Sequence, residues 1–216
     1  MKNQLARLPR HALWLALLLS GAALLPACAP LVLGGAMVGG SLMAIDRRTS
    51  GAQVEDQAIE LKSLSRISDL ATLGHVSITS YNRMVLITGE VPTEADRTRV
   101  EEAMQKVENV RSVVNELAVM GNSSLGARSI DSILSAKVKA TLVDAKDMQA
   151  QAVKVVTERG SVYLMGRVTE REAGRATDLA RSVSGVLKVV RVFEVISESE
   201  LAELTARSPA KAASAP

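Results

Sequence analysis

The chain of 216 residues contains one cysteine, Cys28, whose thiol is the side chain with the most direct covalent chemistry. A single cysteine in an exported protein has no internal disulfide partner. Three basic residues within the first ten positions precede an apolar run, Leu13–Leu25, that ends just before Cys28. This run is shorter than the roughly 20 residues that span a bilayer as a helix. Residues 1–27 are therefore predicted to be a signal peptide that is cleaved.

The four residues Leu25-Pro26-Ala27-Cys28 resemble the lipobox of bacterial lipoprotein precursors, although Pro26 stands where that pattern has a small or hydroxyl residue. The resemblance implies that Cys28 receives a diacylglycerol and, as the new N-terminus, an N-acyl chain. Alanine at position 29 implies the outer membrane as the destination. Two alternatives are ordinary signal cleavage that leaves an idle thiol, and a buried structural cysteine.

The segments outside the folded part of the chain are recognised by composition. Residues 28–54 are predicted to be the lipidated cysteine and a tether, which is apolar and glycine-rich through Ile45 and becomes polar at "DRRTSG" (46–51). The tether is expected to lie against the membrane surface, and a second hydrophobic anchor is the alternative. Residues 198–216, which end in an Ala/Ser/Pro-rich stretch, are expected to be a disordered tail.

Residues suited to catalysis or metal binding are scarce. After the signal peptide the chain has one histidine, His75, which is expected to be a surface or half-buried residue. There is no Cys/His cluster with zinc-ligand spacing, and no nucleotide-binding loop or nucleophile elbow. Glu170 and Glu172 are expected to be helix N-terminal charges. We therefore expect no enzyme, no catalytic residue, no metal and no cofactor beyond the acyl chains.

An internal repeat organises the rest of the chain. The segment "HVSITSYNRMVLITGEV" (75–91) aligns with "AVKVVTERGSVYLMGRV" (152–168) at an offset of 77. The two copies are predicted to be domains at 55–120 and 129–197, joined by a linker at 121–128. Two copies of one small unit indicate duplicated domains rather than one large core.

Each copy is predicted to fold as α-β-β-α-β, an α+β unit. Apolar residues at helical spacing predict the first helix, with Ile59, Leu64, Ile67 and Leu70 in copy one and Ile130, Leu134, Val138 and Leu142 in copy two. A hairpin follows, with turns at Asn82-Arg83 and Arg159-Gly160. Thr93 and Thr169 are expected to cap the second helix. A right-handed crossover then gives a three-stranded mixed sheet with both helices on one face.

The hairpin ending V-x-L-x-G-x-V resembles that of the BON domain, a small bacterial envelope module. It occurs at Val85–Val91 and at Val162–Val168, with Gly89 and Gly166 at the glycine position. A later V-x-G-V element contains Gly185 in copy two, whereas copy one has Asn109 there. The lipobox, tether and two domains together resemble the dual BON-domain outer-membrane lipoproteins of the DolP type. That resemblance implies a protein that binds anionic phospholipid through its second domain and supports envelope integrity.

The two copies differ in net charge. The signal peptide holds 3 of the 26 basic residues and no acidic residue, so the mature chain has 23 of each sign and shows no bias toward nucleic acid. Residues 55–119 have 7 basic and 11 acidic residues (net −4), and residues 128–196 have 12 basic and 8 acidic residues (net +4). The candidate lipid-binding residues lie at the first helix of copy two: Arg128, Ile130, Ile133, Leu134, Lys137 and Lys139.

Three alternatives remain for that helix and for the protein. The apolar residues of the helix are also compatible with a core stripe, and the opposite charges are also compatible with docking of one copy onto the other. For the whole protein, the alternative is a protein–protein adaptor in which sheet edges or the acidic copy recruit envelope assembly or cell-wall machinery.

Overall fold

The computed structural model describes residues 46–68 and 74–207, which belong to one compact unit of the chain, residues 41–216. The signal peptide, Cys28 and the apolar part of the tether lie outside the described residues. None of the helices in these two ranges is long and apolar enough to cross a membrane.

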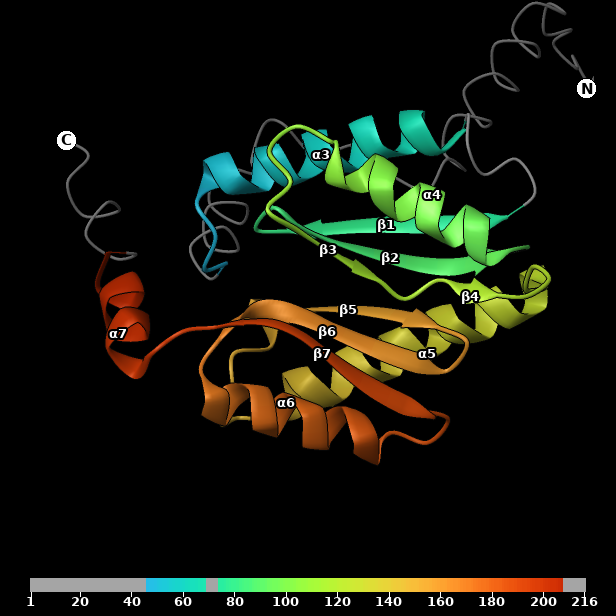
Figure 1. Cartoon of the computed structure of the whole chain (residues 1–216). Coiled ribbons are helices and arrows are strands. Elements are labelled where there is room, and N and C mark those ends of the chain that lie inside the picture. The colour runs from blue at the N-terminus through green and yellow to red at the C-terminus, as the bar shows by residue number, and fades with distance from the viewer. Residues whose placement is uncertain (1–45, 69–73, 208–216) are drawn as a thin grey trace, which may run out of the picture. The chain divides into compact units, whose positions relative to one another are not determined.

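The first domain contains two helices and a mixed sheet (Figure 1). Its elements are α3 (Ser50–Ser68), β1 (His75–Tyr81), β2 (Met84–Val91), α4 (Glu94–Gln105), β3 (Ser112–Asn115) and β4 (Ala118–Val119). β2 pairs antiparallel with β1, and it pairs in parallel with both β3 and β4. The last strand of the predicted unit is thus present but divided in two.

The second domain repeats this order. Its elements are α5 (Leu125–Asp144), a 3-10 turn (Ala150–Ala152), β5 (Val153–Glu158), β6 (Ser161–Val168), α6 (Glu170–Ser182) and β7 (Lys188–Val195). β6 lies between β5 and β7, antiparallel to the first and parallel to the second. The predicted α+β fold, with a mixed sheet and two helices in each copy, is confirmed.

Local backbone chemistry explains where the elements begin and end. Both residues of each hairpin turn have positive φ, at 49° and 67° for Asn82 and Arg83 and at 50° and 68° for Arg159 and Gly160. Such turns match the twist of the strands that they join. Thr93 caps α4, and Thr169 caps α6 in a full capping box with Glu172. Asn109 has a φ of 67°, so it adopts the left-handed conformation of its counterpart Gly185 despite being a different residue.

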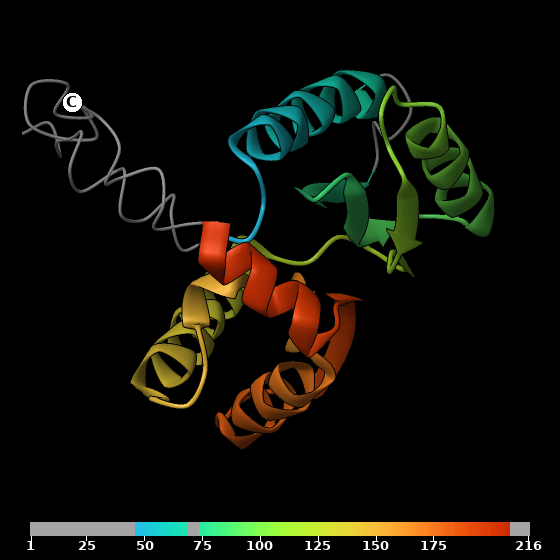
Figure 2. The ribbon, with the colours of Figure 1, turned by 90° about the vertical axis from the view of Figure 1, so that its left-hand side faces the viewer.

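The helices of each domain cover the same face of their own sheet, as Figure 2 shows for both domains. Val85 and Ile87 of β2 pack under α3 and α4, and Val162 and Leu164 of β6 pack under α5 and α6. Every residue of β2 is buried, because its other face is also covered. That second face belongs to a contact between the domains.

Three expectations need correction. The apolar spacing of the first helix in copy one includes Leu64, but this residue is 51% exposed; in copy two Ile130 is 66% exposed, so the core-stripe alternative does not hold for it. The first helix begins at Ser50, inside the segment expected to be a tether. Residues expected to begin a disordered tail instead form a helix, α7 (Glu198–Arg207), which contacts the second domain through the ion pairs Arg167–Glu200 and Arg171–Glu198.

Candidate lipid-binding surface

Helix α5 is positioned by a buried stripe that includes a carboxylate. The buried residues are Asp131, Leu134, Val138 and Leu142, spaced by three or four. Asp131 accepts hydrogen bonds from the backbone N–H groups of Arg159 and Gly160, both at 2.8 Å. The helix is thereby fixed both to the core and to the turn between β5 and β6.

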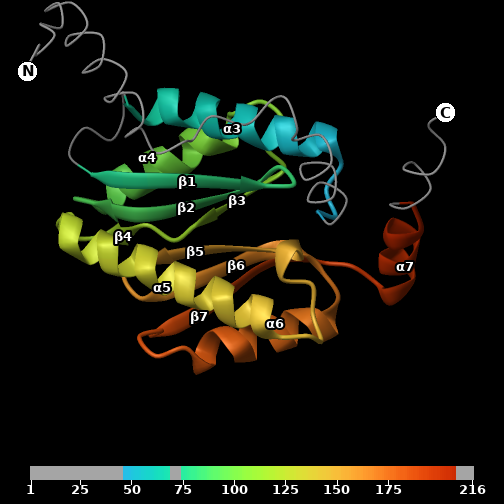
Figure 3. The same ribbon diagram turned by 180° about the vertical axis from the view of Figure 1, so that it is seen from behind.

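The exposed half of α5 carries the apolar and basic residues of the proposed site, with Lys139 on the other side of it from Ile130, Ile133 and Lys137. Ile130 and Ile133 are 66% and 58% exposed, and Lys137 and Lys139 are also exposed. No ion pair to either lysine occurs among the described residues. Figure 3 shows α5 in front of the second sheet, seen from behind. This face therefore combines uncovered isoleucines with uncompensated positive charge.

Two of the six candidate residues, Leu134 and Arg128, are not part of the exposed surface of α5. Leu134 is buried and points toward Gly185, so it belongs to the core and is left out of the surface. Arg128 is half-buried, and its guanidinium donates to the hydroxyl and the carbonyl of Ser123. Both residues stabilise the helix rather than extend the exposed face.

The two copies can be compared position by position, because Asp56 in α3 has the same role as Asp131. Asp56 accepts hydrogen bonds from the N–H groups of Asn82 and Arg83 in the first hairpin turn. With the offset of 75 residues, Glu55 is the equivalent of Ile130, and Ala58 is the equivalent of Ile133. Glu55 accepts a hydrogen bond from Asn109, whereas Ile130 is uncovered. The same fold thus tolerates a polar residue at this position, and its replacement by isoleucine is specific to the second copy.

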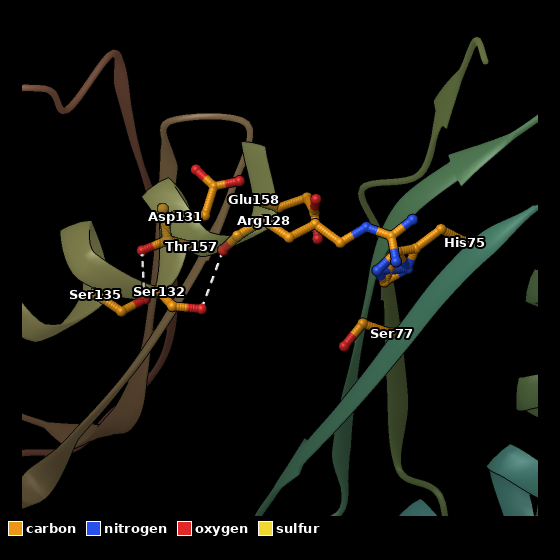
Figure 4. Close-up of a pocket in the computed structure, with 8 residues that line it drawn as sticks. All are labelled: His75, Ser77, Arg128, Asp131, Ser132, Ser135, Thr157 and Glu158. Carbon is orange, nitrogen blue, oxygen red and sulfur yellow. Dashed lines mark hydrogen bonds between the residues drawn. The ribbon is translucent and has the colours of Figure 1, made fainter. Parts of the chain in front are cut away.

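A cavity of about 180 Å³ lies where the start of α5 approaches β1 of the first domain (Figure 4). Arg128 lies beside the ring of His75, and burial together with Arg128 lowers the pKa of His75. Four hydroxyl groups and two carboxylates line the rest of the cavity: Ser77, Ser132, Ser135, Thr157, Asp131 and Glu158. Ser135 donates to Thr157, and Asp131 holds the turn, so most of these groups have partners within the protein.

Glu158 differs from its neighbours in this cavity. Among the described residues no hydrogen bond or ion pair to its carboxylate occurs, although the residue is only 6% exposed. Burial, followed by the charges of Glu90 and Asp131, raises its pKa. The ionised form is therefore disfavoured in the folded protein.

We expect Glu158→Gln to raise the Tm at pH 7.5. Because the pKa of Glu158 is raised in the folded protein, ionisation of this residue destabilises the fold. The destabilisation is absent below the unfolded pKa of about 4.3, and it develops as pH rises through the folded value. The difference in Tm between variant and wild type should therefore shrink toward zero near about pH 4. Circular dichroism melts across this range test the expectation, with Glu102→Gln at an exposed position as the control. A variant that is less stable than wild type at pH 7.5 would contradict it.

Opposite charges of the two domains meet at the contact between their sheets. Tyr81, Met84 and Leu86 of the first domain pack with Tyr163, Met165 and Val192 of the second. Of the four ion pairs between the domains in the described part of the chain, three have the acid in the first domain and the base in the second: Glu60–Lys154, Glu90–Arg159 and Glu116–Lys188. The fourth, Arg111–Glu194, has the opposite polarity. The division of charge thus has a structural use in domain docking. The exposed lysines of α5 lie outside these pairs.

No group of three or more His, Cys, Asp or Glu side chains in the described part of the chain is arranged to hold a metal ion. The face of α5 and the contact between the domains are therefore the surfaces with the most distinctive chemistry.

Comparison with known proteins identifies the repeated unit. The BON domain family matches residues 55–121 and 130–197. The outer membrane lipoprotein DolP of Haemophilus influenzae is 36% identical over 185 residues, covering 84% of this chain and 95% of that protein. The 21 kDa hemolysin of Actinobacillus pleuropneumoniae is 31% identical over 155 residues, covering 70% and 80%. Osmotically-inducible protein Y of Escherichia coli is 27% identical over 144 residues, covering 64% and 72%. The chain belongs to the BON-domain family and carries two copies of the domain.

Proposed function

We propose that this protein is an outer-membrane lipoprotein, held on the periplasmic face by acyl chains on Cys28, whose second BON domain binds anionic phospholipid and supports envelope integrity. The name of the Haemophilus influenzae relative, an outer membrane lipoprotein, supports the location. The observation that carries the lipid contact is one side of α5, where exposed Ile130, Ile133 and Lys137 follow one another at spacings of three and four residues, while Lys139 is exposed farther round the helix.

The chemistry of this face suits the boundary between headgroups and acyl chains. Isoleucine side chains gain free energy when they leave water, by about 1.5–3 kcal/mol for full burial. Each lysine near an anionic surface contributes about 1 kcal/mol. Two lysines and two isoleucines give weak binding by themselves, and the acyl anchor raises the effective concentration at the bilayer. Lipid contact is thus an intramolecular second step after anchoring.

Residues 46–216 provide a form without the acyl anchor for testing, because all residues of the three apolar clusters lie within them. We expect this form to co-sediment with vesicles that contain anionic phospholipid and not with neutral vesicles. The double variant Lys137→Glu/Lys139→Glu lowers the net charge by about four units and should weaken binding to anionic vesicles by at least about tenfold. Ile130→Ser/Ile133→Ser should weaken binding while preserving its dependence on salt, because the lysines remain.

A matched control comes from the first copy. Leu61 of α3 is 69% exposed, so Leu61→Ser removes a comparable apolar side chain from a surface that the proposal does not use. This variant should bind as wild type does. Equal binding to neutral and anionic vesicles, or binding unaffected by the two lysine substitutions, would refute lipid recognition by α5.

The adaptor alternative has one supporting observation. Val54, Leu61 and Leu64 give α3 an exposed apolar stripe that no described residue covers. The acidic charge of the first domain is a weaker argument for a partner, because Glu60, Glu90 and Glu116 are paired with the second domain. Loss of envelope integrity in a Leu61→Ser/Leu64→Ser variant that retains wild-type vesicle binding would favour the adaptor function.

A further inference from the structure

Arg47 connects the membrane-proximal segment of the chain to the second domain. Its guanidinium donates to both carboxylate oxygens of Glu172, each at 2.7 Å, and to the carbonyl of Arg167 at 2.9 Å. A longer bond of 3.3 Å reaches the side-chain oxygen of Gln149. In return, Arg167 donates to the carbonyl of Arg47. All three of these partners belong to the second domain, although Arg47 precedes the first domain in the chain.

The next residue, Arg48, makes the complementary contact with the first domain. Its guanidinium forms an ion pair with Asp56 of α3 at 2.8 Å and lies 4.3 Å from the centre of the Tyr81 ring. Asp46 pairs with the same guanidinium. Figure 2 shows this segment in blue, running from the start of α3 toward the second domain. We call Arg47 and Arg48 the arginine clasp.

The pair formed by Arg47 and Glu172 is buried, with side-chain exposures of 6% and 7%. The bidentate hydrogen bonds from Arg47 are the main cause that lowers the pKa of Glu172. Glu172 also accepts the backbone N–H of Thr169, so its carboxylate is satisfied from both sides. Removing one member of a buried pair leaves an uncompensated charge, which is strongly unfavourable. Without Glu172 the closed arrangement would bury an unpaired guanidinium, so loss of this partner favours release of Arg47 to water.

We propose that Arg47 is a positioning residue that ties the membrane tether to the second BON domain. The clasp lies outside the residues that match the BON family, which begin at position 55. Through Arg47 the second domain is held beside residues 46–48, although these residues come before the first domain in the chain. The second domain is thereby held beside the N-terminal end of the folded unit, as the first domain is through Arg48. The inference rests on the proposed lipid anchor at Cys28, and its test separates the two.

Protease access to the tether provides a direct test, because the chain contains no lysine or arginine between Cys28 and Arg47. Trypsin can therefore cut the tether first at the clasp itself. The mature lipidated protein is reconstituted in proteoliposomes and digested briefly, and released fragments are identified by N-terminal sequencing. A fragment that begins at Arg48 or Thr49 reports opening of the clasp, since cleavage tracks the open population when reclosing is fast.

We expect little of this fragment from the wild type and at least tenfold faster release from Glu172→Gln. Glutamine still serves in a capping box, so α6 keeps its N-terminal cap while Arg47 loses its charged partner. Arg47→Lys keeps the cleavage site and the charge but not the bidentate contact, and it should release at an intermediate rate. Glu170→Gln alters an exposed residue in the same turn of α6 and should release as wild type does. The Tm of the Glu172→Gln second domain should stay close to that of wild type, because Arg47 returns to water when the clasp opens.

Equal release of this fragment from wild type, Glu172→Gln and Glu170→Gln would overturn the positioning role of Arg47. Faster release accompanied by a large fall in Tm would also overturn it, because the effect would then be general unfolding. Failure of the undigested protein to stay with the vesicles would instead refute the lipid anchor, independently of the clasp.

Discussion

Gly89→Ala should destabilise the first domain by about 3 kcal/mol or more, which is a large fraction of the stability of a small domain. Gly89 has a φ of 116°, and a Cβ atom on it would lie 1.9 Å from the carbonyl oxygen of His75. Both the backbone conformation and the close approach of β1 exclude a side chain. Urea unfolding of residues 46–216, followed by circular dichroism, measures the loss.

Gly185→Ala is the matched comparison. Gly185 also has a positive φ, 101°, but the nearest atom to an added Cβ is the Cδ1 of Leu134 at 3.5 Å. Only the conformational penalty applies there, so a loss of about 1–2 kcal/mol is expected. If Gly185→Ala were the more damaging change, steric exclusion at Gly89 would be the wrong explanation. Gly166 should resemble Gly89, because its added Cβ would meet the carbonyl oxygen of Ala152 at 2.3 Å.

The order of elements was predictable because each depends on local chemistry. The turn residues Asn82-Arg83 and Arg159-Gly160, and the capping residues Thr93 and Thr169, act within a few positions of themselves, so short patterns identify them. The docking of the domains depends on residues far apart in the chain. One signal for it was visible: Met84–Ile87 and Val162–Met165 are apolar without alternation, as in strands buried on both faces.

The core stripes of the first helices were predicted less well, and the reason is chemical. The buried positions are Asp56, Ile59, Ser63 and Ile67 in α3, and Asp131, Leu134, Val138 and Leu142 in α5. An apolar pattern passes over the aspartates and includes Leu64, which is exposed, and it leaves open whether Ile130 belongs to the core or to the surface. The aspartates are buried because the backbone N–H groups of the hairpin turns need an acceptor. That contact joins residues far apart in the chain, so an apolar pattern does not reveal it. Burial of Asp131 also leaves Ile130 free for the surface that we propose contacts lipid.

The clasp could not be derived from the sequence, because "DRRTSG" is polar and lies beside an apolar tether. Composition alone indicates a segment that enters water. Only the three-dimensional arrangement brings Arg47 to Glu172, which is 125 residues away. The capping pattern at Thr169 identified Glu172 as a helix N-terminal residue, and that role holds together with the contact to Arg47.

Asp131→Ala should destabilise the second domain by about 2–4 kcal/mol, because it removes the acceptor for two partly buried N–H groups at once. Asp131→Asn should recover little of this loss despite its matching shape. The amide has one acceptor oxygen, and its NH₂ group would face the second N–H donor. The expected order of stability is therefore wild type, then Asn, then Ala, with Asn closer to Ala.

Amide hydrogen exchange at Arg159 and Gly160 locates the effect of Asp131. Both amides should exchange faster in the variants, and the increase should exceed that at the centre of β6. Asp144→Asn, at an exposed position of the same helix, should change neither stability nor exchange. If Asp131→Asn kept wild-type stability, the two hydrogen bonds would not be what fixes α5 to its hairpin. The orientation of Ile130 and Lys137 would then need another cause, since the same helix carries the proposed lipid surface on its opposite face.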